Sequence, residues 1–204
     1  MTAMSTTVRS IEMRALNLLR RAEALARPVD LDKVAAALGV LVHRETLEEE
    51  VSGVLIVKGE EKHVLLNKRQ DRRRQRFTLG HELGHLVLHH THGDRLIVDK
   101  QIRVYRRVGE PSSREYRDPD SMTDAREEQE ANTFSAALLM PAPLMRRAAL
   151  EIDLRDERDI SSLSGLFDVS EPAMVIRLQN LNLVHTGFPS PGAGRVSAQQ
   201  PLFA

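Results

Sequence analysis

The chain has 204 residues, of which 41% are hydrophobic, and its 29 lysines and arginines equal its 29 aspartates and glutamates. The resulting zero net charge excludes a whole-molecule field that would steer the protein toward nucleic acid or anionic lipid. The absence of cysteine excludes disulfides, thiol catalysis and thiolate metal ligands.

The N-terminal segment predicts helices rather than a targeting signal. Residues 1–15 contain no apolar core of a signal peptide, and no stretch of the chain approaches the ~20 apolar residues that a membrane helix needs. We therefore expect a cytoplasmic protein that does not enter a membrane. Residues 8–26 have the apolar spacing of a helix, and residues 31–38 are a second predicted helix, introduced by Asp30.

Three short apolar runs then predict strands, at residues 39–44, 53–58 and 62–67. They are rich in β-branched residues and leucine, and glutamate-rich or Gly-Glu-Glu breaks separate them. We expect a small, mostly antiparallel sheet.

A basic cluster follows the third strand, made up of Lys68, Arg69, Arg72, Arg73, Arg74 and Arg76. Cations at the beginning of a helix oppose its dipole, which would suit docking of an acidic partner or a phosphate. The alternative, which we favour, is a solvated loop whose arginines pair with nearby glutamates.

The most informative motif is His81-Glu82-Leu83-Gly84-His85, which has HExxH spacing. Four residues advance about 6 Å along a helix and turn about 40° past one revolution, so both imidazoles leave from one face. They can then bind one zinc ion, which lowers the pKa of a bound water to about 7 and leaves Glu82 to take the proton. The alternative is an amphipathic helix that carries two histidines and a solvated glutamate without a metal.

The histidines and the long polar segment after the motif are not expected to add ligands. His89 lies about 12 Å along the helix from His81, too far for one zinc ion, and we interpret it with His90 and His92 as helix-end and surface histidines. Residues 93–122 are predicted to form a loop or lid, in which Tyr105 and Tyr116 are candidates for stabilising an oxyanion.

A third protein ligand is expected, because a catalytic zinc ion normally has three. Asp124 and Glu127 form a predicted capping box for a helix of about four turns, which Pro141 ends. On this helix Glu128 and Asn132 share one face, so the carboxylate could bind zinc while the amide oxygen accepts the spare N–H of a ligand histidine.

We favour Glu128 over Glu127 or Glu130 as this ligand, because small residues around it indicate close packing against another helix. The alternative for Glu128 is a solvated carboxylate that favours the helix dipole.

Near the C-terminus, residues 160–167 and 171–181 resemble a helix-turn-helix in outline, which raises the rival hypothesis of a DNA-binding regulator. The second helix offers Arg177 as its only cation and begins with Glu171, a poor complement to phosphate. We therefore favour two helices that support the ligand helix, and we expect direct nucleic-acid binding to be absent.

Two long motifs, residues 75–89 and 128–141, are similar to those of the ImmA/IrrE family of metallopeptidases. Together with residues 28–31 and 52–55, the resemblance spans about residues 25–180. Gly80 and Ser135 depart from the pattern, because the family often has alanine at both positions.

The resemblance implies a gluzincin-like zinc site in which His81 and His85 are ligands, Glu82 is the base and Glu128 is the third ligand. It also implies a substrate class, since several such proteins cleave helix-turn-helix repressors and thereby relieve repression of stress-response or mobile-element genes. The alternatives are a DNA-binding regulator and a protein that binds the repressor without cutting it. Zinc rather than another divalent metal is an expectation from ligand type.

The fold expected from these elements is α+β: a minimal zincin-like metallopeptidase whose small sheet packs on the HExxH and ligand helices. We expect residues 1–150 to form this domain, residues 151–186 a helical subregion packed on it, and residues 187–204 a flexible tail.

Overall fold

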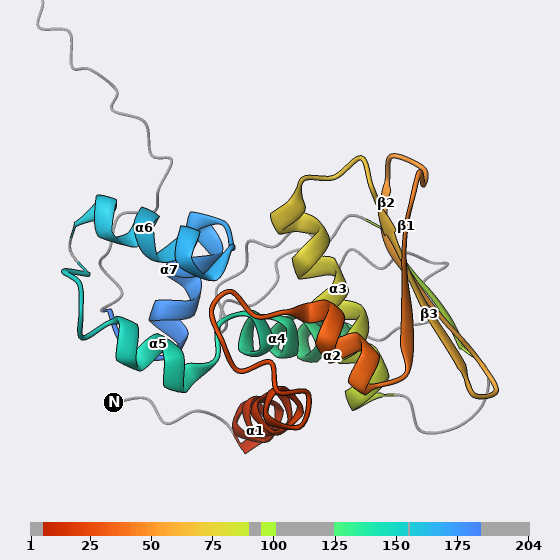
Figure 1. Cartoon of the computed structure of the whole chain (residues 1–204), viewed down its shortest axis with the longest axis horizontal. Coiled ribbons are helices and arrows are strands. Elements are labelled where there is room, and N and C mark those ends of the chain that lie inside the picture. Colours follow the sequence, from red (N-terminus) through yellow and green to blue (C-terminus); the bar gives the residue numbers. More distant parts are fainter. Residues whose placement is uncertain (1–5, 90–94, 101–124, 155, 185–204) are drawn as a thin grey trace, which may run out of the picture.

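The structure, a computed structural model, describes residues 6–89, 95–100, 125–154 and 156–184. Its strands are β1 (Val40–Glu45), β2 (Val51–Lys58), β3 (Glu61–Asn67) and β4 (Arg95–Lys100). Its helices are α1 (Thr6–Arg21), α2 (Leu31–Ala37), α3 (Arg72–Leu88), α4 (Ala125–Leu139), α5 (Ala142–Ala148), α6 (Glu157–Phe167) and α7 (Glu171–Asn180) (Figure 1). His90, His92, Tyr105, Tyr116, Asp124 and the predicted tail lie outside the described residues.

The four strands form one sheet in the order β1-β3-β2-β4. β2 is antiparallel to both β3 and β4, whereas β1 runs parallel to β3, so the expectation of a mostly antiparallel sheet is confirmed. β4 was not predicted. It lies in the long polar segment that we interpreted as a loop. Only three apolar residues, Leu96 to Val98, stand between charged neighbours there, so the sequence pattern did not indicate a strand.

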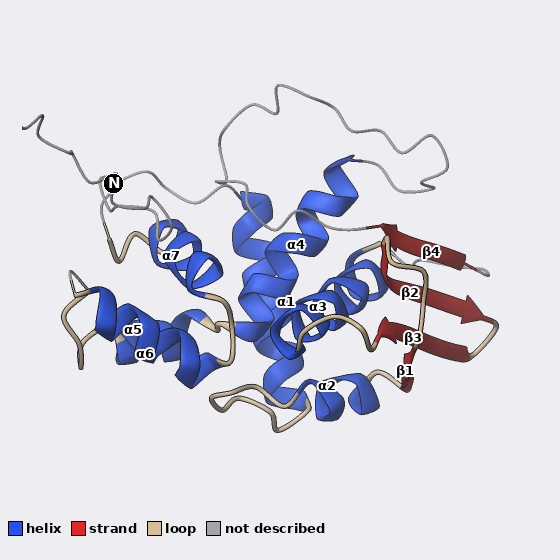
Figure 2. Cartoon of the chain, turned by 90° about the horizontal axis from the view of Figure 1, so that it is seen from above, coloured by secondary structure: helices blue, strands red, loops and turns tan. Residues whose placement is uncertain are grey.

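The described helices gather on one side of the sheet (Figure 2). α3 lies between the sheet and α4 and contacts β2 and β3, while α4 also packs on α1. On the covered face, Leu55, Val57, Val64 and Leu66 are buried, as the alternation of side chains along a strand requires. This arrangement is the expected α+β fold, with the HExxH helix at its centre.

α1 ends earlier than the apolar spacing predicted. Glu23 adopts a left-handed conformation with φ of 51°. The Ala24 N–H then bonds the Leu19 carbonyl at 2.9 Å, and the Glu23 N–H bonds the Arg20 carbonyl at 3.2 Å. These bonds make a Schellman motif, which stops the helix at Arg21. This helix end could not be predicted from the sequence, because glutamate rather than glycine occupies the left-handed position.

Side-chain caps fix where α2 and α3 begin. Asp30 accepts the Lys33 N–H at 3.1 Å, as predicted, and Asp71 accepts the Arg74 N–H at 3.0 Å. Each cap satisfies a backbone donor that the first turn leaves without a partner. Arg72, Arg73 and Arg74 of the basic cluster therefore lie in the first turn of α3, and Arg76 lies in the next turn, rather than in a loop.

The C-terminal helices form a group at the end of the molecule away from the sheet (Figure 1). α6 and α7 were predicted, but the short helix α5 was not. Arg177 of α7 is 3% exposed, and its guanidinium donates to both carboxylate oxygens of Glu12 and to the Met140 carbonyl. Arg177, the one cation of α7, therefore binds groups inside the protein, on α1 and at the end of α4, and does not face solvent as a DNA contact would.

Candidate metal centre

α3 and α4 bring three possible ligand atoms together. His81 Nε2 lies 3.2 Å from Glu128 Oε2, and His85 Nε2 lies 3.2 Å from Glu128 Oε1. The two ring nitrogens are 2.9 Å apart. Both histidine side chains are fully buried, and that of Glu128 is 33% exposed. Two residues one turn apart on one helix and a carboxylate from another thus converge as predicted.

The two helix backbones approach closely because glycine faces α4. A Cβ added to Gly84 would lie 3.0 Å from Ala131 Cα and 3.1 Å from its carbonyl oxygen. A Cβ on Gly80 would lie 2.5 Å from Ser135 Oγ, which donates to the Phe77 carbonyl at 2.9 Å. This close packing lets the Glu128 side chain reach both imidazoles.

The carboxylate of Glu128 is held ionised. Its partial burial raises the pKa, but hydrogen bonds from His81 and His85, with the charge of both rings, outweigh burial and hold it well below its usual range. A carboxylate and two imidazoles whose ligand atoms lie within 4.8 Å of one another are the donor set of a catalytic zinc site. The residues present therefore fit a zinc ion.

Asn132 lies behind this set. Its Oδ1 is 3.1 Å from His81 Nδ1, so the amide can accept the Nδ1–H, which directs Nε2 of the ring toward Glu128 and His85, where it would bind a metal. The structure places this pair as the sequence spacing predicted.

The other nearby acidic and basic residues point elsewhere. Glu130 accepts from Arg126 at 2.9 Å and lies 3.8 Å from His89. His89 is the C-cap of α3, so its predicted place at the helix end is confirmed, but its side chain is only 9% exposed, so the surface part of that interpretation was wrong. Burial lowers the pKa of His89. The charge of His85 lowers it further, whereas the negative charges of Glu127 and Glu130 oppose the shift. Neither residue belongs to the group of converging ligand atoms.

Glu82 is fully buried where β2 passes over α3. A Cβ on Gly53 of β2 would lie 2.5 Å from Thr78 Cγ2 and 3.1 Å from Glu82 Oε1. Only glycine lets the strand come this close. A lone glycine inside an apolar run is a sequence signal for such an approach, and it could have pointed to Gly53 before the fold was known.

Asp168, in the turn between α6 and α7, forms ion pairs with three of the six residues of the basic cluster. Its carboxylate lies 2.9 Å from Arg72 Nε, 3.3 Å from Arg76 Nε and 3.9 Å from Arg73 Nε. Burial lowers the pKa of Arg76, and Asp168 opposes that shift. The expected partners were nearby glutamates, so this assignment was wrong for these three arginines.

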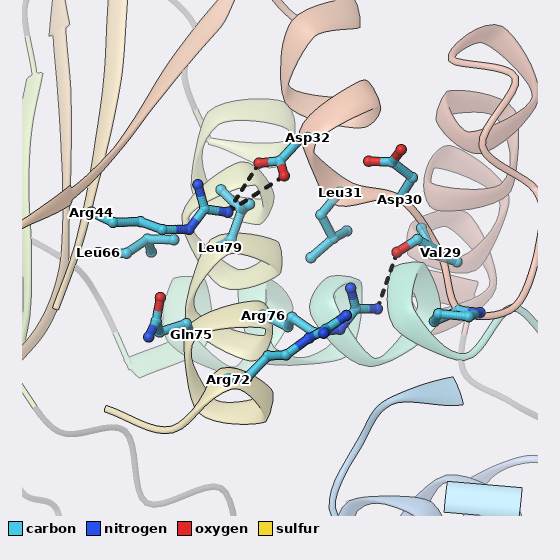
Figure 3. A pocket seen from close by; sticks show the side chains of 11 residues that line it. Val29, Asp30, Leu31, Asp32, Arg44, Leu66, Arg72, Gln75, Arg76 and Leu79 are labelled. Atoms are coloured by element: carbon cyan, nitrogen blue, oxygen red, sulfur yellow. Dashed lines mark hydrogen bonds and ion pairs between the residues drawn. The ribbon is translucent and has the colours of Figure 1, made fainter. Parts of the chain in front are cut away.

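A pocket of about 480 Å³ adjoins this cluster and is distinct from the metal centre (Figure 3). Its wall on α3 includes Arg72, Arg76 and Leu79, which leave the helix on roughly the opposite side from His81. Arg44 faces Asp32 at 3.1 Å across the pocket, and Arg76 donates to the Val29 carbonyl at 3.1 Å. These two arginine side chains in the pocket wall therefore already bind groups of the same chain.

Within the described residues, no helix has the length and apolar character to cross a membrane.

Comparison with known families finds that the Peptidase M78 model, described as the IrrE N-terminal-like domain, matches residues 35–179. This match covers well over half of the chain and contains α3 and α4 with all three converging side chains. No curated protein matches the chain.

Proposed function

The chain belongs to the Peptidase M78 family of IrrE N-terminal-like domains, and from that premise we propose that it is a zinc-dependent endopeptidase. The observation that carries the proposal is the meeting of His81, His85 and Glu128 within 4.8 Å of one another. A membership in a peptidase family and a donor set suited to zinc support the same chemistry independently.

Each residue has a part in the proposed reaction. His81, His85 and Glu128 hold the metal, and Asn132 orients the His81 ring. When bound, zinc supplies a Lewis acid for the scissile carbonyl and lowers the pKa of water. Glu82 takes the proton released as water attacks and passes it to the leaving amine. Gly53 keeps β2 close to Glu82, which excludes solvent from that carboxylate.

We propose a helix-turn-helix transcriptional repressor as the substrate, cleaved to relieve repression in a stress or mobile-element response. This choice rests on the resemblance of the two long motifs to ImmA/IrrE proteins. A regulator that binds DNA through α7 is less well supported, because the Arg177 guanidinium is bound by Glu12 and Met140. Phosphate contacts need accessible cations.

The test is cleavage of repressors encoded beside the gene for this chain. We expect the purified, zinc-loaded protein to cut one of them, and a chelator or Glu82→Gln to abolish the cut. Glu82→Gln should retain zinc, which separates proton transfer from metal binding. Cleavage that persists at full rate in Glu82→Gln would contradict the proposed base.

A further inference from the structure

Two histidines lie together on the face of the sheet that the described helices leave uncovered. β1 and β3 are parallel with Leu41 opposite His63 and His43 opposite Leu65, so the histidines are diagonal neighbours. Val64 and Leu66, which alternate with His63 and Leu65, are buried against the helices. His43 and His63 therefore project away from the metal centre, on the other side of the sheet.

The two rings are hydrogen-bonded to each other through nitrogens that face one another. His43 Nε2 lies 3.0 Å from His63 Nδ1, and the ring planes are 25° apart with centroids 5.3 Å apart. With both rings neutral, one N–H donates to the lone pair of the other. Among the described residues, no carboxylate or cation forms an ion pair with either ring.

We propose that His43 and His63 form a second binding site for a borderline divalent cation such as Ni²⁺, Cu²⁺ or Zn²⁺. Two metal–imidazole bonds of about 2.1 Å that meet at a right angle span about 3.0 Å, which is the observed separation of the two nitrogens. The nitrogens of His81 and His85 are similarly close, at 2.9 Å. On binding, the two rings, whose nitrogens face each other in this structure, turn toward the cation, and the donor ring moves its proton to its other nitrogen, so no proton is lost.

The surroundings favour access but limit affinity. Most of the adjoining outward positions on the described strands are aliphatic: Leu41, Val54, Ile56, Leu65, Leu96 and Val98. The exceptions beside the histidines on their own strands are Glu45 and Glu61, whose negative charge favours a cation. Among the described residues, neither belongs to a group of three converging ligand atoms, so the site has two protein ligands. Since His43 is exposed, water or a partner molecule fills the remaining coordination positions. The site should therefore bind more weakly than the buried centre with its carboxylate.

The test is a Ni²⁺ titration by calorimetry on protein already loaded with zinc and freed of excess metal. We expect one further equivalent of Ni²⁺ to bind the wild type, and His43→Gln and His63→Gln each to weaken that binding at least tenfold. Leu41→Ala, a change at the position paired with His63, is the matched control and should bind as the wild type does.

Absence of Ni²⁺ binding to the zinc-loaded wild type would overturn the proposal. Unchanged binding in both histidine variants would overturn it too, because the ion would then occupy other groups. His81→Ala keeps this inference separate from the proposed function: it should lose zinc yet still take up Ni²⁺ at His43 and His63. As a second readout, the electron paramagnetic resonance spectrum of bound Cu²⁺ should report two coordinated nitrogens.

Discussion

Replacing Gly80 with alanine tests whether close contact between α3 and α4 builds the centre. Alanine is favoured over glycine inside a helix by about 1 kcal/mol. Here the new Cβ would lie 2.5 Å from Ser135 Oγ, which is buried and bonded to the Phe77 carbonyl. Overpacking costs about 1–3 kcal/mol, and displacing the hydroxyl breaks a bond of about 1 kcal/mol. Gly80→Ala should therefore lower the free energy of unfolding by about 1–3 kcal/mol.

A double-mutant cycle with Ser135→Ala isolates this contact. Ser135→Ala alone should cost about 1 kcal/mol for the lost hydrogen bond. In the double variant the clash with Oγ is gone, although Cβ still lies 3.3 Å from Ser135 Cα, so its stability should nearly equal that of the wild type. Urea unfolding of chelator-treated proteins should then give a coupling of about 2–4 kcal/mol. Additive losses, with coupling below about 0.5 kcal/mol, would refute this explanation of the helix contact.

Three further changes test other parts of the site. Glu128→Ala should weaken zinc binding by more than about 100-fold in a chelator competition, whereas Glu127→Ala and Glu130→Ala should have little effect; equal losses would leave the third ligand unassigned. Asn132→Ala should weaken zinc binding about 10–100-fold in the same assay, because the His81 ring loses its orienting acceptor, and an unchanged affinity would argue against that role. Asparagine tolerates the left-handed backbone at position 168 but lacks the charge that pairs with the arginines, so Asp168→Asn should lower the free energy of unfolding by about 1–3 kcal/mol in urea at low salt. A loss that did not shrink in about 1 M salt would not come from the arginine pairs.

The sequence was sufficient for features that local chemistry determines. The HExxH spacing fixes His81 and His85 on one helical face, and Glu128 and Asn132 follow from the same periodicity on α4. The Asp30 cap marked the beginning of α2 for a similar reason. The converging geometry of these side chains needed only two helices in contact, which the glycines and alanines of both motifs indicated.

Features set by distant contacts were missed. Asp168 is 92 residues from Arg76, and no periodic pattern links the turn after α6 to the beginning of α3. Burial of Arg177 depends likewise on Glu12, which is 165 residues away in the sequence. β4 forms by pairing with β2, so its short apolar run gains meaning only once that neighbour is in place.

The central claim is that His81, His85 and Glu128 hold one metal ion beside a separate base. Elemental mass spectrometry of purified, zinc-saturated protein after removal of free metal measures this directly. We predict one zinc ion per chain in the wild type and in Glu82→Gln, and none in His81→Ala or His85→Ala. A full equivalent of zinc retained in either histidine variant would contradict the claim.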